Sequence, residues 1–424
     1  MRMSPLCWLG GVTLVACHLS TEPGGQPADD PILPPASRVV GLAMAFQTTC
    51  ALTADGKLHC WGENRFGEFG NGTTTSSAQP VAGGGGLAFG LIAGSMGTPQ
   101  MCGVTADGTS YCWGYNLNGE LGDGTTVDHY EPVPIDANIR FRMLTSSYHT
   151  CGLSDEDIAY CWGDGLGGQL GTGTDTSALR PARVAGTTTY SHITNGMQFS
   201  CALARSGLAE CWGWGVGLGS GSGDRSVPAP TAVSGGHLFR DISAGEEHVC
   251  AITQAGEVYC WGKMTPLWPE GFRPEPTRIP MPVRLVSVAS GSRMFVGGTS
   301  CGLATQGVAY CWHSGLEPVP VPGGYRFAGL TGGHGKFCGF TPGGSVLCWR
   351  WVAVQVGTAD RWIVSTPEPP PRLRAHPEER HGSGLLLQQL LRSCDDDLRM
   401  YQSRFFDNPA QWGHVVKIHN DKSG

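Results

Sequence analysis

Seven pairs of cysteines, in each of which the second cysteine follows the first by ten positions, constrain the fold of this chain more than any other feature. The pairs are Cys50 and Cys60, Cys102 and Cys112, Cys151 and Cys161, Cys201 and Cys211, Cys250 and Cys260, Cys301 and Cys311, and Cys338 and Cys348. Their first members follow one another at intervals of 52, 49, 50, 49, 51 and 37 residues. These intervals indicate an internal repeat of about 50 residues, a length typical of propeller blades and solenoid units.

Each unit reads as a β-hairpin in which the two cysteines face each other. In the first unit, residues 50–61 read CALTADGKLHCW, and pairing the cysteines leaves residues 54–56 as a three-residue loop. Such a loop favours a left-handed residue at its last position, which glycine adopts at the lowest cost. Glycine stands there, six places after the first cysteine, in six units, and Asp157 stands there in the other. The repeat therefore predicts seven antiparallel hairpins.

The opposed cysteines of such a hairpin lie within reach of a disulfide, because directly paired residues have Cα atoms about 4.5 to 5.5 Å apart. We therefore expect seven disulfides, each within one unit. Two alternatives stay open, namely seven reduced structural pairs and metal ligation, although zinc sites use shorter spacings and supporting histidines. Disulfides in this number indicate an oxidising compartment.

The rest of the unit predicts its burial. The residue two places after the first cysteine is apolar in every unit, and the residue after the second cysteine is always Trp. The position between the first cysteine and the apolar residue is only Ala or Gly, which predicts that a backbone or a large ring, such as the neighbouring Trp, lies close to it. A short strand-like run precedes each hairpin and a proline-led run follows it. Each unit thus supplies about four short strands, the content of a propeller blade.

The units resemble the repeat of the regulator of chromosome condensation family. The resemblance rests on a His before the first cysteine, an apolar run after it, Trp-Gly and a glycine-rich run, as in His149–Leu153, Trp162-Gly163 and Gly168-Gln-Leu-Gly-Thr-Gly173. Residues 67–72 and 119–124 are close copies of the glycine-rich run. The resemblance covers about residues 37–356 and implies an all-β fold, a seven-bladed β-propeller. Units five to seven lack the glycine-rich run, and the paired cysteines of all seven units resemble an extracellular variant of the repeat.

The ends of the ring are expected to latch together. We assign residues 37–366 to the propeller and expect the apolar run Trp351–Val356 to complete the first blade, which would leave no open sheet edge.

The N-terminal residues predict export. Residues 1–16 are typical of a signal peptide, and Leu14-Val-Ala-Cys17 resembles a bacterial lipobox. Cys17 is therefore predicted to carry lipid, with residues 17–36 as a proline-rich tether. This places the protein in the bacterial cell envelope, at the outer membrane or the cell surface, with a lipid anchor as its membrane contact. Ordinary signal cleavage without lipidation is the alternative.

The C-terminal residues 367–424 form a separate, more highly charged segment. Residues 385–401 have the apolar spacing of an amphipathic helix, which could dock on the ring, bind a partner or belong to a disordered tail. Cys394 is left without a partner by the repeat pairing, and its role stays open.

The sequence contains few residues in patterns that indicate catalysis. Residues 298–302 match G-x-S-x-G, but that motif needs a strand-turn-helix setting with His and acid partners, and Ser300 merely precedes a repeat cysteine. His149 and His248 are interpreted as turn-stabilising rather than catalytic. An enzyme in the central channel would need polar groups on the axis-facing strands, where the repeat puts small and apolar residues. We therefore predict no catalytic residue, cofactor or metal site.

The function predicted is a non-enzymatic, surface-tethered protein-interaction module, a monomer that binds an envelope or extracellular protein. The net charge of −7 gives no reason to expect a nucleic-acid partner. Aromatic residues that vary between units are the candidate contact residues, namely Phe66, Tyr115, Trp214 and Trp268. The alternatives are guanine-nucleotide exchange by family analogy and a carbohydrate-binding propeller that uses the repeated tryptophans.

Overall fold

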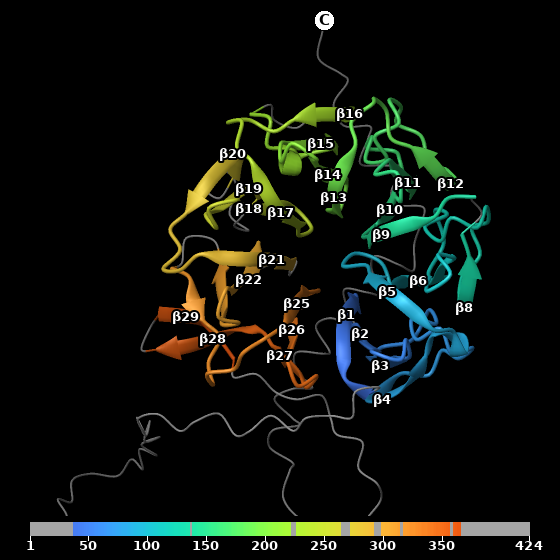
Figure 1. Ribbon diagram of the computed structural model, residues 1–424, viewed down its shortest axis with the longest axis horizontal. Coiled ribbons are helices and arrows are strands. Elements are labelled where there is room, and N and C mark those ends of the chain that lie inside the picture. The colour runs from blue at the N-terminus through green and yellow to red at the C-terminus, as the bar shows by residue number, and fades with distance from the viewer. Residues whose placement is uncertain are drawn as a thin grey trace, which may run out of the picture. The chain divides into compact units, whose positions relative to one another are not determined.

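The computed structural model describes residues 37–135, 138–221, 226–263, 272–291, 298–313, 317–356 and 359–365. The described chain forms a ring of seven small antiparallel sheets around a central axis, so the predicted seven-bladed β-propeller is confirmed (Figure 1). The predicted signal peptide, Cys17, the tether and the C-terminal tail lie outside the described residues, and so does Trp268.

Each blade is a meander whose strands are neighbours in sequence. The strands of blades 1 to 3 are β1 (Val39–Ala45), β2 (Thr48–Thr53), β3 (Leu58–Gly62), β4 (Ser77–Gly83), β5 (Phe89–Gly94), β6 (Gln100–Thr105), β7 (Ser110–Gly114), β8 (His129–Pro134), β9 (Phe141–Ser146), β10 (His149–Ser154), β11 (Ala159–Gly163) and β12 (Ala178–Arg183). Those of blades 4 and 5 are β13 (Tyr190–Asn195), β14 (Phe199–Ala204), β15 (Ala209–Gly213), β16 (Val227–Ala232), β17 (Phe239–Ala244), β18 (His248–Thr253), β19 (Val258–Lys263) and β20 (Phe272–Ile279). Those of blades 6 and 7 are β21 (Leu285–Gly291), β22 (Thr299–Ala304), β23 (Ala309–His313), β24 (Val319–Pro320), β25 (Gly329–Gly332), β26 (Phe337–Phe340) and β27 (Val346–Trp349).

The second and third strands of every blade form the hairpin that the sequence predicts. Cys50 pairs with Cys60 and Leu52 with Leu58, and the same register recurs in the other units. The loop glycines adopt positive φ, and so does Asp157 with a φ of 63°. Arg142 and Arg205 both form ion pairs with the Asp157 carboxylate, which anchors the non-glycine turn.

The structure contains all seven predicted disulfides, each within one hairpin. They join Cys50 to Cys60, Cys102 to Cys112, Cys151 to Cys161, Cys201 to Cys211, Cys250 to Cys260, Cys301 to Cys311 and Cys338 to Cys348. The bridged cysteines have Cα–Cα distances of 4.0 to 4.1 Å. These distances are a little below the value of about 4.5 Å expected of directly paired residues. The alternatives of reduced pairs and of metal ligation by these cysteines do not describe the structure.

The small residue after the first cysteine accommodates a large ring, but not the one expected. A Cβ atom on Gly103 would lie 2.5 Å from Cδ1 of Phe89, and one on Gly152 would lie 2.5 Å from Cδ1 of Phe141. Both rings come from the first strand of the same blade. The neighbouring Trp is therefore not the main reason for the small side chain.

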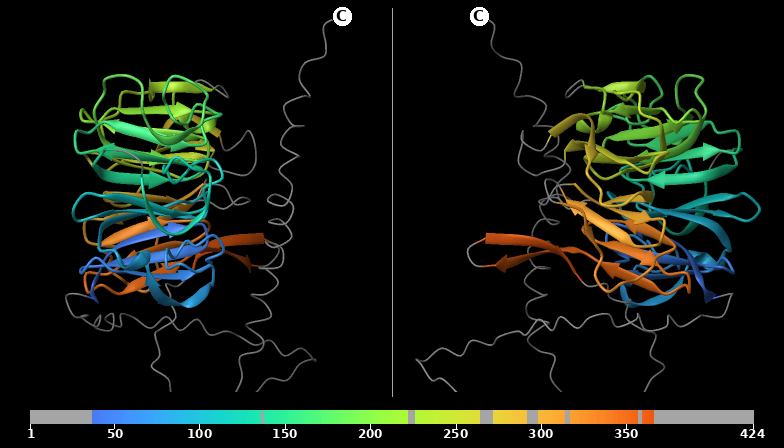
Figure 2. Two further views of the ribbon diagram at one scale, coloured as in Figure 1. Left: turned by 90° about the vertical axis from the view of Figure 1, so that its right-hand side faces the viewer. Right: turned by 60° about the vertical axis from the view of Figure 1, so that its left-hand side comes forward.

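The prediction that residues 351–356 complete the first blade is wrong. Blade 1 takes all four of its strands from residues 39–83, because each blade coincides with one sequence unit. The run forms β28 (Trp351–Val356), which pairs with β29 (Ala359–Val364) in a separate hairpin that extends beyond the ring (Figure 2). Such a local pairing closes a much shorter loop than one with the first blade, so its entropic cost is lower.

The ring closes by side-chain packing of blade 7 on blade 1. Val39 and Trp61 of blade 1 share a hydrophobic cluster with Val346 of blade 7. Lys336 Nζ also donates a hydrogen bond to Thr49 Oγ1 across the same junction, at 3.0 Å.

Candidate interaction surface

One face of the ring carries two kinds of loop from each four-stranded blade. Because the four strands of a blade are antiparallel neighbours, the turn between its first and second strands and the loop between its third and fourth strands emerge on the same side. Backbone hydrogen bonds join the two, from Tyr115 N–H to the Pro99 carbonyl at 3.1 Å and from Trp214 N–H to the Gln198 carbonyl at 2.7 Å. We call this side the loop face and the opposite side the hairpin face.

Buried asparagines fix the conformation of the loops in blades 1 and 2. Asn116 is fully buried, its Oδ1 accepts the Leu121 N–H at 2.9 Å, and its Nδ2 donates to the Val127 carbonyl at 3.0 Å. Asn64 occupies the same place in blade 1, where its Oδ1 accepts the Phe69 N–H at 2.8 Å. These loops are therefore held by hydrogen bonds across their own span.

The repeated tryptophans attach the loops to the next blade. Each indole N–H donates to a carbonyl in the loop of the preceding blade: Trp113 to Glu68 at 2.8 Å, Trp162 to Glu120 at 2.9 Å, Trp212 to Gln169 at 3.0 Å and Trp261 to Gly217 at 2.9 Å. All four indoles are fully buried. They are part of the scaffold and offer no face on which a sugar could stack, which weighs against the carbohydrate-binding alternative.

Two buried carboxyl groups lie at the base of these loops. Glu120 accepts the Asn118 N–H at 2.8 Å, and Glu68 accepts the Phe66 N–H at 2.9 Å. Burial raises the pKa of both carboxyl groups to about 7. In blade 3 the neutral Gln169 has the same structural role, because its Oε1 accepts the Gly167 N–H at 2.7 Å. The carboxyl groups therefore brace loops rather than face a ligand.

Three of the four candidate contact residues lie on the loop face. Phe66 and Tyr115, from adjacent blades, are half-buried and form an edge-to-face pair with ring centroids 5.4 Å apart. Trp214 lies farther round the ring, beside Gly167 of blade 3, and is 48% exposed. Among the tryptophans whose side chains the structure describes, only Trp214 is exposed. The structure therefore brings two candidates together and places the third apart.

The most exposed apolar side chains of this face are aliphatic. The sequence-based prediction, which considered aromatic residues alone, did not include them. Leu166 is 73% exposed, Val127 61% and Leu117 60%. Leu117 and Leu166 each stand four places after the repeated Trp, so an apolar residue recurring at that position in adjacent units was the signal that could have found them. Together with Tyr130, Leu179 and Trp214, these residues form a set of exposed apolar side chains on blades 2 to 4, which we call the apolar loop set.

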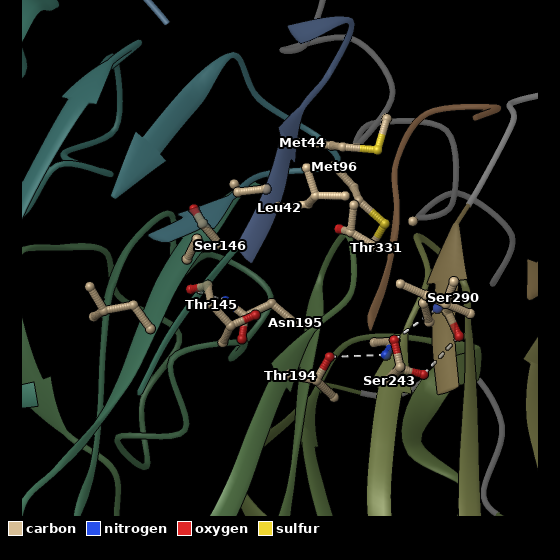
Figure 3. Close-up of a pocket in the computed structure, with 18 of the residues that line it drawn as sticks. Leu42, Met44, Met96, Thr145, Ser146, Thr194, Asn195, Ser243, Ser290 and Thr331 are labelled. Atoms are coloured by element: carbon tan, nitrogen blue, oxygen red, sulfur yellow. Dashed lines mark hydrogen bonds between the residues drawn. The ribbon is translucent and has the colours of Figure 1, made fainter. Parts of the chain in front are cut away.

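The central channel opens into a pocket of about 240 Å³, which the first strands of all seven blades line (Figure 3). Leu42 and Ile92 make its wall apolar in blades 1 and 2, as expected. Blades 3 to 7 depart from that expectation, because Thr or Ser side chains line the pocket in each of them, including Thr194, Ser243 and Ser290. These hydroxyl groups join neighbouring blades: Thr194 Oγ1 accepts the Ala244 N–H and Ser243 Oγ accepts the Ser290 N–H, both at 2.9 Å. No titratable side chain of the described residues lines this pocket.

His149 and His248 connect blades rather than stabilise turns. His149 Nε2 lies 2.7 Å from Ser200 Oγ, and His248 Nε2 lies 3.0 Å from Ser300 Oγ, in each case across a blade junction. Burial lowers the pKa of His149 to about 3 and that of His248 to about 4. Ser300 itself is fully buried within β22, which is not the strand-turn-helix setting of a nucleophile elbow. His248 Nδ1 has no hydrogen-bond partner in the described part of the chain, so no acid orients this pair.

Across the described ranges, no group of three or more His, Cys, Asp or Glu side chains is arranged to hold a metal ion. The described residues also form no helix with the length and hydropathy needed to span a membrane.

Comparisons with known proteins agree with the repeat. The family described as "Regulator of chromosome condensation (RCC1) repeat" matches residues 39–68, 156–203 and 239–265. Over 93 residues the chain is 37% identical to the ultraviolet-B receptor UVR8 of Arabidopsis thaliana. The aligned segment covers 21% of this chain and 20% of the receptor. Over 88 residues it is 36% identical to the human E3 ubiquitin-protein ligase HERC2. This segment covers 20% of this chain and 2% of that protein. The chain thus spans a fifth or less of these relatives.

Solved structures support the architecture. Human WBSCR16 superposes with a TM-score of 0.62 at 15% identity, covering 70% of this chain and 85% of that one. Yeast RCC1 (Prp20) superposes with a TM-score of 0.59 at 20% identity, covering 72% and 81%. At these identities the likeness concerns the fold alone.

The register and the superpositions define the class: this protein is a seven-bladed β-propeller, and three segments of its repeat match the RCC1 repeat. Every blade contains a disulfide, which indicates an extracellular or otherwise oxidising environment.

Proposed function

We propose that this propeller is a non-enzymatic protein-interaction module of the bacterial cell envelope, tethered to a membrane through lipid on Cys17, and that its partner binds the loop face of blades 2 to 4. The observation that carries the proposal is the apolar loop set, in which Leu166 is 73% and Trp214 48% exposed. Large exposed apolar side chains grouped on one face are typical of protein-binding surfaces.

The rigidity of the loops supports this assignment. Asn116 holds the loop of blade 2, and the buried Trp162 and Trp212 attach the loops of blades 2 and 3 to the next blade. A partner that binds such loops orders little chain on binding, so less of the interaction free energy is lost to conformational entropy.

A similar ring supplies an analogy for protein binding. Prp20p of Saccharomyces cerevisiae has binding properties to Gsp1p and histones. Exchange activity on a small GTPase would require a cytosolic or nuclear partner, whereas seven disulfides favour a partner in an oxidising compartment.

The test is a quantitative capture of envelope proteins by the purified, oxidised chain. The double variant Leu166→Ala/Trp214→Ala should lose the specific partner, because both side chains belong to the apolar loop set. The matched control is Leu208→Ala/Leu238→Ala, which removes side chains that are 43% and 51% exposed on the hairpin face. A partner retained by the first variant and lost from the control would assign recognition to the hairpin face and refute the proposal.

The tether has its own test. A fatty-acid analogue should label the wild-type chain and a Cys7→Ser control but not Cys17→Ser, because only Cys17 stands in the lipobox-like sequence. Labelling that survives Cys17→Ser would refute lipidation at this residue.

A further inference from the structure

A recurring arginine lies on the hairpin face, where the chain enters a blade. Each blade has a buried residue at or just before the start of its first strand, such as Phe327 in blade 7. The Phe327 N–H donates to the carbonyl of Gly307 in the hairpin loop of blade 6 at 2.8 Å, and four other junctions contain the equivalent bond. The residue immediately before the buried one is an exposed arginine in four blades, namely Arg38, Arg140, Arg284 and Arg326. These arginines therefore lie beside the hairpin loops.

Three of the four arginines belong to consecutive blades. Blades 6, 7 and 1 are neighbours around the closed ring, and they contribute Arg284, Arg326 and Arg38, which we call the arginine arc. A Cβ atom on Gly256 would lie 2.8 Å from Cβ of Arg284, and one on Gly344 would contact the Arg38 side chain. The arginine arc thus follows the hairpin loops of blades 5, 6 and 7 along one side of the hairpin face.

The positive charge of the arginine arc is not neutralised within the described chain. The hairpin loops beside it contain no charged residue, since they read Gln-Ala-Gly at 254–256, Thr-Gln-Gly at 305–307 and Pro-Gly-Gly at 342–344. Of the nearby carboxyl groups on this face, that of Glu257 already pairs with Arg278 at 2.9 Å. None of the ion pairs formed by the described residues includes an arginine of the arc. The arc is therefore a patch of uncompensated positive charge.

The loop face has the opposite charge. The loops of blades 2 and 3, residues 115–128 and 164–177, contain no Lys or Arg. Their aspartates are exposed or half-buried, namely Asp123, Asp128, Asp164 and Asp175. Arg180 of β12 lies against the first of these loops, at Gly124. The two faces thus differ in the sign of their charge, and an anionic surface would attract the hairpin face and repel the loop face.

The described chain also enters the ring at the arginine arc. Arg38 directly precedes β1, which runs from the hairpin face to the loop face. The tether of the proposed function, from Cys17 to residue 37, therefore joins the ring on the hairpin face. A membrane that holds lipid on Cys17 would accordingly be reached from the side of the arc.

We propose that the arginine arc binds the anionic headgroups of a membrane, so that the hairpin face lies on the bilayer and the loop face points away from it, towards the partner. The orientation rests on the proposed tether and the apolar loop set, whereas the headgroup binding rests on the arc alone. Each arginine near an anionic lipid surface raises the affinity by about fivefold, and salt screens this attraction over about 10 Å. The three arginines together favour binding by about a hundredfold.

The test is co-sedimentation of the full chain carrying Cys17→Ser with vesicles, so that no lipid on this residue contributes. The chain should bind phosphatidylglycerol vesicles more tightly than phosphatidylcholine vesicles at low ionic strength, and high ionic strength should weaken this preference. In the same chain, Arg38→Gln/Arg284→Gln/Arg326→Gln should weaken binding to phosphatidylglycerol vesicles by at least about tenfold.

The matched control is Arg65→Gln/Arg180→Gln/Arg273→Gln, which removes the same charge away from the arginine arc. It should bind the anionic vesicles as tightly as the parent chain. Both variants keep the same N-terminal residues as the parent, so a difference between them reports the arc. Hydrogen exchange locates the contact independently, because the anionic vesicles should slow exchange in the hairpin loops of blades 5 to 7 and not in the loops of blades 2 and 3.

Three results would overturn the proposal. Equal binding to the two kinds of vesicle would mean that headgroup charge is not recognised. An equal loss in the two triple variants would mean that net charge matters and the arc does not. Tighter binding to soluble polyphosphate than to the anionic vesicles would assign the arc to a soluble polyanion. Each of these results leaves fatty-acid labelling of Cys17 and capture of the partner, the tests of the proposed function, unaffected.

Discussion

Blades 1 to 4 and blades 6 and 7 share the same disulfide hairpin but differ in the group that accepts the indole N–H at the junction between blades. In the first group a loop carbonyl accepts the indole N–H of the next blade, as Glu120 does from Trp162 at 2.9 Å. In the second group the Trp349 indole N–H points instead to the sulfur of Cys311, at 3.2 Å. Both groups still form blades with a buried Trp and the same register.

The comparison separates what makes a blade from what a blade displays. The hairpin, its disulfide and the Trp are sufficient for the fold, because blades 6 and 7 keep them without the glycine-rich loop. The loops are therefore free to differ, and the blades that retain the braced loops are also those that carry Leu117, Leu166 and Trp214. This division agrees with the proposal that the braced loops bind a partner while the repeated residues stabilise the ring.

The largest expected effect is the loss of a repeated indole. Trp162→Ala should lower the free energy of unfolding by roughly 3 to 5 kcal/mol, because it leaves a large cavity between two blades. Urea unfolding of the oxidised protein measures this value. A stable Trp162→Ala variant that no longer binds its partner would reverse the assignment of repeated residues to the scaffold.

The buried carboxyl group of a braced loop should make stability fall as pH rises from about 4.5 to 7. The pKa of Glu120 is about 7 in the folded protein, above the ordinary value of 4.5, so the folded state holds its proton more tightly than the unfolded state. Stability is therefore lost as pH rises from about 4.5 through 7. Glu120→Gln, which copies Gln169, should raise the free energy of unfolding at pH 8 by an amount on the order of 3 kcal/mol and change it little at pH 4.

The control is Glu131→Gln, which changes an exposed carboxyl group instead of a buried one. Equal gains from Glu120→Gln at pH 4 and pH 8 would show that the carboxyl group does not titrate in this range. The buried histidines act in the opposite direction, because the pKa of His149 is lowered to about 3, and they limit stability as pH falls below about 6.5.

A smaller effect distinguishes the two groups of blades directly. Trp162→Phe keeps a large ring but removes the N–H that the Glu120 carbonyl accepts, and it should cost about 1 kcal/mol more than Trp349→Phe, whose N–H meets only a weak sulfur acceptor. Paired urea titrations measure the difference. Equal costs would mean that the hydrogen bond to the loop does not stabilise the blade.

Much of the fold was accessible from the sequence because it is local. The spacing of Cys50 and Cys60, with a glycine at the left-handed position, predicts the hairpin register with no knowledge of neighbouring blades. The closure of the ring was not accessible in this way, because the partner of residues 351–356 depends on competition between a nearby strand and a distant one. In the structure these residues pair with the nearby strand, residues 359–364.

The candidate site was predicted only in part, for a related reason. Variation between units pointed to Phe66, Tyr115 and Trp214, but exposure depends on how adjacent loops pack, so the half-burial of Phe66 and Tyr115 could not be read from the repeat. The bonds of His149 to Ser200 and of Trp162 to Glu120 likewise join residues of different units, and only the three-dimensional ring brings them together.

The most direct test of the division between scaffold and display measures folding and binding on one variant. Trp214→Ala, changed at a side chain 48% exposed, should leave the free energy of unfolding within about 0.5 kcal/mol of the wild-type value. The same variant should bind the captured envelope partner at least about tenfold more weakly, as expected of an aromatic contact residue. If Trp214→Ala instead destabilises the ring by several kcal/mol, or leaves both stability and binding unchanged, the loop face of blades 2 to 4 is not the display surface and the division fails.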